Sequence, residues 1–199
     1  DLLKDIQGAT HHIHFQYYIF CDDEVGIRFK DALIAKAKEG VKVRVLYDDV
    51  GCWNVKDKFF NEMKEAGIEV YAFLKVAFPV FTSKVNYRNH RKIVVIDGQI
   101  GYMGGMNIAD RYEKGTAWGT WRDTHFRIIG KGVHGLQSTF LIDWYVVSKK
   151  LLNDKIFYPP AKIYHDDNIM QIATSGPVGQ WRTLLQAYIF TIANAKKYI

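Results

Sequence analysis

Helical and extended patterns alternate along residues 1–73, and this alternation limits the folds open to the chain. Apolar positions recur at helical spacing in some segments and at every second residue in others. Strands that alternate with helices of this length favour a mostly parallel sheet with helices packed on its faces. The expected elements are a helix over residues 2–9, a strand over 12–19, a helix from Asp22 or Asp23 to Gly40, a strand over 41–49, a helix over 55–66 and a strand over 68–73.

The middle of the chain has a different pattern. Ile93-Val94-Val95-Ile96 is continuously apolar, which is typical of a buried central strand. Asp97-Gly98 predicts a tight turn into a returning strand over 99–103. A further strand over 124–129 and a long helix over 133–150, with Leu136, Phe140 and Trp144 in line, complete the pattern. The expected fold class is therefore α/β, a mixed and mostly parallel sheet sandwiched between helices.

Composition narrows the classes of protein. An apolar fraction of 48% excludes a disordered chain, and no run approaches the roughly 18 apolar residues of a membrane-spanning helix. No signal peptide is recognised at the start. Cys21 and Cys52 are too few for a disulfide framework or a zinc site. The net charge of +6 favours anionic partners such as nucleic acid, acidic lipid or phosphorylated small molecules, or it serves solubility alone.

The densest group of reactive side chains precedes and includes the apolar strand. His90 and Lys92 are two residues apart at the start of that strand, so their side chains share a face. An imidazole beside an ammonium suits chemistry at anionic phosphorus, because the histidine attacks or moves protons and the lysine stabilises charge on oxygen. Further along, Gly104-Gly105 allows close approach of the backbone to a ligand, and the Asn107 amide is a donor for a phosphate oxygen.

Each of these features alone has an ordinary structural explanation, as a satisfied histidine, a glycine turn or a hairpin signal. Their joint spacing is more specific: His-x-Lys, four residues, Asp97, six residues, Gly-Gly-x-Asn. In this spacing the chain resembles the phospholipase D superfamily, and within it the bacterial cardiolipin synthases. The similarity extends in order through Tyr17-Tyr18-Ile19-Phe20, Val45-Leu46-Tyr47-Asp48-Asp49-Val50-Gly51, Tyr87-Arg88-Asn89-His90-Arg91-Lys92, Gly104-Gly105-Met106-Asn107-Ile108 and Trp121-Arg122-Asp123-Thr124-His125.

The resemblance implies a site shared by two similar halves, each with one such motif. His90 is then the nucleophile that forms a phosphohistidine, or its general-acid partner, and the nucleophile is preferred. Lys92, Asn107, Gly104 and Gly105 would hold the phosphate.

The resemblance also counts Asp97 with the catalytic motif, although its place in a turn predicts support of the loop. Asp123 is expected to orient the His90 ring, because a catalytic imidazole needs a partner that fixes its tautomer. The alternative for Asp123 is an ordinary surface carboxylate.

The sequence departs from the family pattern in having no second His-x-Lys-x4-Asp. Leu3, Ile6, Ala9 and Ile13 recur with the same spacing as Ile189, Ile192, Ala195 and Ile199, which suggests a duplication. We therefore expect a first lobe over 1–155, a connecting segment over 156–180 and the start of a second lobe over 181–199. His12 and His14 share a strand face, but no carboxylate or cysteine accompanies them at ligand spacing, so no metal and no cofactor are expected.

The resemblance favours a phosphatidyltransferase that makes cardiolipin from two phosphatidylglycerol molecules. Alternatives are a phosphodiesterase that uses water as acceptor, and an inert half-enzyme or interaction module. The expected partners are anionic phospholipid, a membrane surface and a second lobe in cis or a second copy in trans. Nucleic acid is not expected, because no basic and aromatic stripe is present. The expected location is the bacterial cell membrane, with membrane helices upstream, and Phe78, Phe81, Lys84 and Arg88 are candidates for lipid contact.

Overall fold

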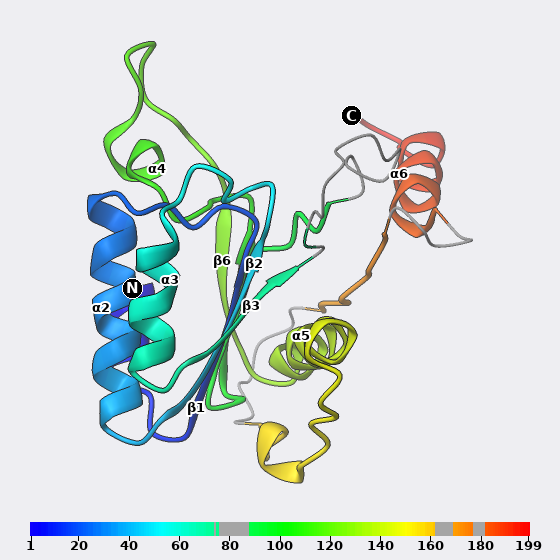
Figure 1. Ribbon diagram of the computed structural model, residues 1–199. Helices are drawn as coiled ribbons and strands as arrows, with labels where there is room; N and C mark the ends of the chain where they lie inside the picture. Colours follow the sequence, from blue (N-terminus) through cyan, green and yellow to red (C-terminus); the bar gives the residue numbers. More distant parts are fainter. Residues whose placement is uncertain (74, 76–87, 162–168, 177–181) are drawn as a thin grey trace.

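The alternating pattern forms a six-stranded sheet with helices on both faces (Figure 1). The computed structural model describes residues 1–73, 75, 88–161, 169–176 and 182–199. In chain order the elements are α1 (Leu2–Gln7), β1 (His12–Tyr17), α2 (Glu24–Lys38), β2 (Lys42–Asp48), α3 (Asp57–Glu65), β3 (Glu69–Phe73), β4 (Ile93–Ile96), β5 (Ile100–Gly104), α4 (Asp110–Lys114), β6 (His125–Ile129), α5 (Gly132–Ser148), η2 (Lys155–Phe157) and α6 (Thr183–Ala193).

The sheet is mixed, with strand order β3-β2-β1-β4-β5-β6. β1 pairs with β2, and β2 with β3, in parallel, because α2 and α3 return the chain to the same edge. The pairs β1–β4, β4–β5 and β5–β6 are antiparallel. The α/β class is confirmed, but the expectation of a mostly parallel sheet is correct only for β1, β2 and β3. In the second half only β4 and β5 are joined by a short hairpin; β5 and β6 are antiparallel across a longer connection that contains α4.

Local signals set the helix and strand ends. The Asp23 side chain accepts a hydrogen bond from the Gly26 amide and caps α2, as expected. At the β4–β5 hairpin, Asp97 and Gly98 both adopt positive φ angles of 53° and 66°, a conformation that aspartate and glycine tolerate better than most residues. Ile96 pairs with Ile100, so three residues form the connection. The predicted hairpin is confirmed.

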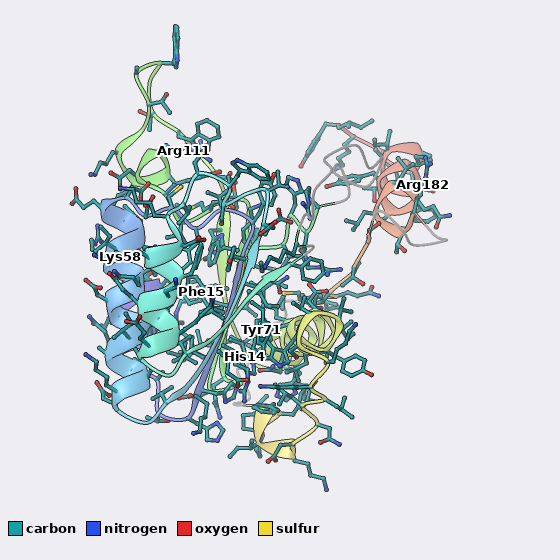
Figure 2. The ribbon with its side chains drawn as sticks, in the orientation of Figure 1. His14, Phe15, Lys58, Tyr71, Arg111 and Arg182 are labelled. Atoms are coloured by element: carbon teal, nitrogen blue, oxygen red, sulfur yellow. The ribbon has the colours of Figure 1, made fainter. Side chains whose placement is uncertain are left out.

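Two hydrophobic layers enclose the sheet. Adjacent residues of β1 point to opposite sides: Phe15 packs toward α2 and α3, whereas His14 packs toward α5 (Figure 2). The α5 layer contains Leu136, Phe140 and Trp144, all at most 1% exposed, which confirms the predicted helix face. β1 is buried on both sides, and it lies beside β4 at the centre of the sheet.

The chain after α5 packs partly on this body. Phe157 is buried against the rings of His12 and His14, and Ile172 packs against the α5 layer. The helix α6 differs, since every one of its residues is exposed. It begins and ends earlier than the repeat at residues 189–199 suggested. The short helix α4 was not expected from the sequence.

Candidate active site

His90 and Lys92 lie in an extended segment that leads into β4. The residues between and before them, Arg91 and Asn89, point to the α5 side of the sheet. Arg91 Nη1 and Asn89 Nδ2 donate to the carboxylate of Asp143 on α5, at 2.6 Å and 2.8 Å. Because alternate residues of an extended segment face opposite ways, these contacts direct His90 and Lys92 away from α5.

Asp143 is a positioning residue that the sequence analysis did not identify. Its carboxylate is 4% exposed and also accepts a hydrogen bond from Gln16 Nε2 on β1 at 2.7 Å. A buried carboxylate is stable only when such donors compensate for lost water. The sequence does indicate that Asp143 is buried, because position 143 falls on the same helical face as Leu136 and Phe140.

Asp48, at the end of β2, anchors the same segment from a second direction. Its carboxylate is 1% exposed and accepts hydrogen bonds from the main-chain N–H groups of Val50 and Gly51, both at 3.0 Å, and of Asn89 at 3.2 Å. Arg88 Nε lies 3.4 Å from the same carboxylate. Asp48 belongs to the segment that carries the family resemblance, but no role for it was predicted from the sequence.

The His90 imidazole is exposed and stacks on the Tyr18 ring, with centroids 3.8 Å apart and planes inclined by 21°. Partial burial lowers the pKa of His90, the Lys92 ammonium lowers it further, and the Asp48 carboxylate offsets this only in part. The neutral imidazole is therefore favoured. Only that form has the free electron pair that a nucleophile needs.

Lys92 shares the Tyr18 ring with His90. Its Nζ lies 5.4 Å from the ring centroid and donates to the main-chain carbonyl of His90 at 2.6 Å. Burial lowers the pKa of the ammonium, and the Asp123 carboxylate opposes that change. One aromatic ring thus brings together an imidazole and a cation, the pair expected from the His-x-Lys spacing.

Asp123 is not placed where the sequence analysis expected it. Its carboxylate accepts a hydrogen bond from the Thr124 amide and influences Lys92 and His125 electrostatically. Among the residues that the structure describes, the His90 ring makes no hydrogen bond to Asp123. The Gly105 backbone approaches Asp123 closely, which draws this carboxylate toward the Lys92 side of the site.

Gly104 and Gly105 allow two chain segments to meet. A Cβ atom on Gly104 would collide with the backbone of residues 124–125, and one on Gly105 would collide with the Asp123 carboxylate. Asn107 is 7% exposed, its Oδ1 accepts from the Ile19 amide at 3.0 Å, and its Nδ2 donates to the Tyr112 hydroxyl at 2.6 Å. Within the described residues the second N–H of Nδ2 has no partner, and an amide N–H of this kind is a donor for a phosphate oxygen.

Asp97 lies at the opposite end of β4, roughly 16 Å of strand beyond Lys92 at about 3.3 Å per residue. Its carboxylate accepts from the Thr10 amide and hydroxyl and from the His11 and His12 amides, at 2.8 to 2.9 Å. Burial raises the pKa of Asp97, but these hydrogen bonds outweigh it and hold the pKa below its usual range. This geometry agrees with the expected role of Asp97 in supporting a loop. It does not bring the Asp97 carboxylate to a substrate bound beside His90.

The two buried histidines of β1 lie on the α5 side of the sheet, whereas His90 faces away from α5. His12 and His14 are fully buried against Gln137 on α5, whose Nε2 lies 2.8 Å from His14 Nδ1. No group of His, Cys, Asp and Glu suited to a metal ion is found within the described ranges. Of the residues considered for lipid contact, Arg88 pairs with Asp48, while Phe78, Phe81 and Lys84 lie outside the described residues, as does His165.

Comparison with known families decides the classification. The family described as cardiolipin synthase, PLD-like domain, matches residues 2–116, which include His90, Lys92 and Asn107. The chain belongs to this cardiolipin synthase family.

Curated relatives carry the same name. The chain is 45% identical over 203 residues to the major cardiolipin synthase ClsA of Bacillus subtilis (strain 168), covering 100% of this chain and 42% of that protein. It is 43% identical over 200 residues to the cardiolipin synthase of Alkalihalophilus pseudofirmus, covering 100% of this chain and 40% of that protein. The chain therefore spans about two fifths of the length of these relatives.

Solved structures support the family fold. Nuc from Salmonella typhimurium, a phospholipase D family member, superposes with a TM-score of 0.53 at 19% identity, over 73% of this chain and 86% of that one. The phosphatidylserine synthase of Haemophilus influenzae gives a TM-score of 0.53 at 15% identity, over 81% and 37% of the two chains. At such identities the likeness concerns the fold alone, and that fold is phospholipase D-like.

Proposed function

We propose that this chain is the first lobe of a phosphatidyltransferase that makes cardiolipin from two phosphatidylglycerol molecules. The observation that carries the proposal is the His90 imidazole, which stacks on the Tyr18 ring beside Lys92. Its pKa is lowered, which favours the neutral form of the ring. A neutral imidazole is a nucleophile for phosphorus, and an adjacent ammonium stabilises the charge that builds on the phosphoryl oxygens. The names of the bacterial relatives indicate which phosphodiester is the substrate.

In the first step a ring nitrogen of His90 attacks the phosphorus of one phosphatidylglycerol. The N–P bond forms as the bond from phosphorus to the departing glycerol oxygen breaks, and that oxygen takes up a proton from a general acid. The phosphatidyl group stays on the enzyme as a phosphohistidine. Lys92 and the Asn107 side-chain amide hold the non-bridging oxygens during this step, next to the closely packed glycine pair Gly104-Gly105.

In the second step a terminal hydroxyl of another phosphatidylglycerol attacks the same phosphorus. Its proton passes to the group that acted as acid, the N–P bond breaks, and His90 regains its electron pair. If water took the place of the alcohol, the product would be phosphatidic acid. The two outcomes share every residue described above and differ only in the acceptor.

A second lobe supplies the general acid in this proposal. One His-x-Lys-x4-Asp motif occurs in the sequence, and the chain spans about two fifths of its curated relatives. We divide the chain into a first lobe over 1–155, a connecting segment over 156–180 and the beginning of a second lobe over 181–199. The wholly exposed apolar helix α6 supports this division, since such a helix requires a partner surface.

The proposed location is the bacterial cell membrane, where the lipid substrate resides. No helix in the described part of the chain has both the length and the apolar character needed to cross a bilayer.

The test uses the full-length protein with phosphatidylglycerol vesicles that carry a labelled glycerol headgroup. We expect cardiolipin and free glycerol in equal amounts, and mass spectrometry of rapidly quenched enzyme should find phosphatidyl or phosphoryl modification on His90. If phosphatidic acid is the sole product, the enzyme is a hydrolase and the proposed transfer reaction is wrong. A covalent phosphate on another histidine, with none on His90, would assign His90 the general-acid role instead.

A further inference from the structure

The exposed tryptophans of the described chain gather at one edge of the molecule. Four tryptophans are described, and Trp144 is buried in the α5 layer. Trp53, Trp118 and Trp121 are 58%, 98% and 45% exposed. A fully exposed indole is unusual on a soluble surface, because it leaves a large apolar side chain in water.

Trp118 and Trp121 belong to a hairpin-like connection between α4 and β6, which projects away from the body of the molecule (Figure 1). Thr116 and Gly119 close its tip with reciprocal main-chain hydrogen bonds of 2.9 Å and 3.0 Å. The Trp118 amide donates to Thr116 Oγ1 at 3.3 Å. The main-chain N–H groups of Thr116, Trp118 and Gly119 are thus satisfied internally, which lowers the cost of leaving water.

Charge is absent from this tip. Residues 115–121 are Gly-Thr-Ala-Trp-Gly-Thr-Trp, although 24% of the whole chain is charged. Arginines flank the tip on both sides. The Arg111 guanidinium lies 5.9 Å from the Trp121 ring centroid at the base of the projection, and Arg122 follows directly (Figure 2). The nearby acids Asp110 and Glu113 are paired with Lys114 and Arg28.

Trp53 lies in a second connection at the same edge, between β2 and α3. Residues 50–55 carry no charge either. This connection packs against the end of β1, because the Phe20 amide contacts Cys52 Sγ at 3.3 Å and Gly51 lies directly against the Tyr18 carbonyl. Tyr18 is the ring on which His90 stacks. The Trp53 connection and the reactive pair therefore share one rigid support.

We propose that the Trp118 projection and the Trp53 connection seat together in the headgroup region of a phospholipid bilayer. Tryptophan favours this region because its ring is apolar and its N–H is a donor, and flanking arginines suit anionic headgroups. The contact brings the edge that carries His90 to the membrane surface. The inference takes the lipid substrate from the proposed function, but contact with a bilayer is measurable without turnover.

The first experiment places a fluorescent label at position 118 in the full-length protein. Trp118→Cys is combined with Cys21→Ser, while the buried Cys52 is retained, and the protein is reconstituted in phosphatidylglycerol bilayers. Nitroxide attached to lipid near the headgroup should quench a label at 118 strongly. A matched label from Lys42→Cys, exposed at the opposite end of β2, should respond only to iodide in the aqueous phase.

Two results would overturn the proposal. Quenching of the 118 label by iodide with no effect of lipid nitroxide would leave the projection in water. Protection of the label from both quenchers would show that protein, such as a second lobe, covers it. If lipid nitroxide quenches the label but the protein forms no cardiolipin, the bilayer contact is supported and the proposed function is wrong.

The second experiment compares two physical forms of the substrate. Trp118→Ala should reduce the rate of turnover of bilayer phosphatidylglycerol by about tenfold, as expected for loss of a modest interfacial contact. Its rate with a short-chain phosphatidylglycerol below its micelle concentration should match that of the unmodified protein. Trp118→Phe should restore most of the bilayer rate. An equal loss with both substrates, or no loss with either, contradicts the proposed anchor.

Discussion

The two ends of β4 contain parts of one short motif but have opposite characters. At one end, His90 is exposed and its imidazole and Lys92 face a shared Tyr18 ring. At the other end, the Asp97 carboxylate receives four hydrogen bonds from Thr10, His11 and His12. A single spacing of residues therefore specifies both reactive groups and an anchor that fixes the start of β1. Residues that recur together in a motif need not touch one substrate.

The largest expected effect comes from removing the nucleophile at the reactive end. His90→Asn should reduce cardiolipin formation by about 10⁴-fold or more, because no covalent intermediate can form. The midpoint of thermal unfolding should change little, since the His90 ring is exposed. The matched control is His134→Asn, which removes a histidine on α5 that contacts Pro159. Retention of more than a tenth of the activity in His90→Asn would contradict the assignment.

At the anchoring end the effect should fall on stability. Asp97→Asn keeps the side-chain size and tolerates the positive φ angle, but it turns an amide group toward N–H donors. We expect a loss of about 3 kcal/mol in the free energy of unfolding, measured with urea, because the main-chain donors lose a charged acceptor and one of its two oxygens. The turnover number of the remaining folded enzyme should stay within about twofold, since 97 lies far from the chemistry.

Asp31→Asn, on the exposed side of α2, is the control for that measurement and should cost less than about 0.5 kcal/mol. A stable Asp97→Asn protein with greatly reduced turnover would reverse the comparison, since it would make Asp97 a participant in the reaction.

Acid should weaken the anchoring end next. Burial lowers the pKa of His12 to about 4 and that of His14 well below its usual value, so the folded protein holds both rings neutral. In the unfolded chain they take up protons near pH 6.5. Stability is thus complete above pH 6.5 and falls as the pH drops from 6.5 toward 4, by about 3 kcal/mol for His12 alone.

Urea unfolding at a series of pH values measures this loss. His12→Asn keeps a polar partner for Gln137 and removes one titrating ring, so its stability should vary less between pH 6.5 and 4. If the two proteins lose stability in parallel over that range, the buried histidine does not cause the loss.

A smaller effect on activity should follow from weakening the contacts that support the His90 segment while His90 and Lys92 are left unchanged. Asp143→Asn weakens the hold on Asn89 and Arg91, which direct His90 away from α5. We expect the turnover number to fall about 10- to 100-fold with little change in KM, because misorientation affects the chemical step. Arg91→Lys, which keeps one cationic contact, should fall between Asp143→Asn and the unmodified protein. A rise in KM with an unchanged turnover number would point to substrate binding instead.

Much of the fold could be predicted from local patterns. Apolar periodicity located the strands, Asp97-Gly98 located the hairpin, and Leu136, Phe140 and Trp144 defined the buried face of α5. The antiparallel pairing of β1 with β4 and of β5 with β6 could not be read in this way, because these strands are far apart in the sequence and meet only in the folded sheet. The brief helix α4 also lacked a pattern long enough to recognise.

Within the site, the spacing of His90 and Lys92 was sufficient to place them together. The supporting residues were not predictable as partners, since Asp48, Asp143 and Tyr18 come from β2, α5 and the end of β1 and meet only after packing. The orienting role expected of Asp123 stays a prediction, since the structure gives its carboxylate a hydrogen bond from the Thr124 amide. A carboxylate near in sequence to a family motif has several possible neighbours, and the close approach of Gly105 selects among them.

The hydrogen bonds that three side chains donate to Asp143 also have a consequence for motion. They join α5, the central strand β1 through Gln16, and the segment that carries His90 into one buried cluster. Local opening of that segment would leave a buried carboxylate without its donors, so it should occur together with undocking of α5. In hydrogen exchange, the amides of residues 89–91 should then exchange at the rate of the helix and not at the faster rate of an ordinary surface loop.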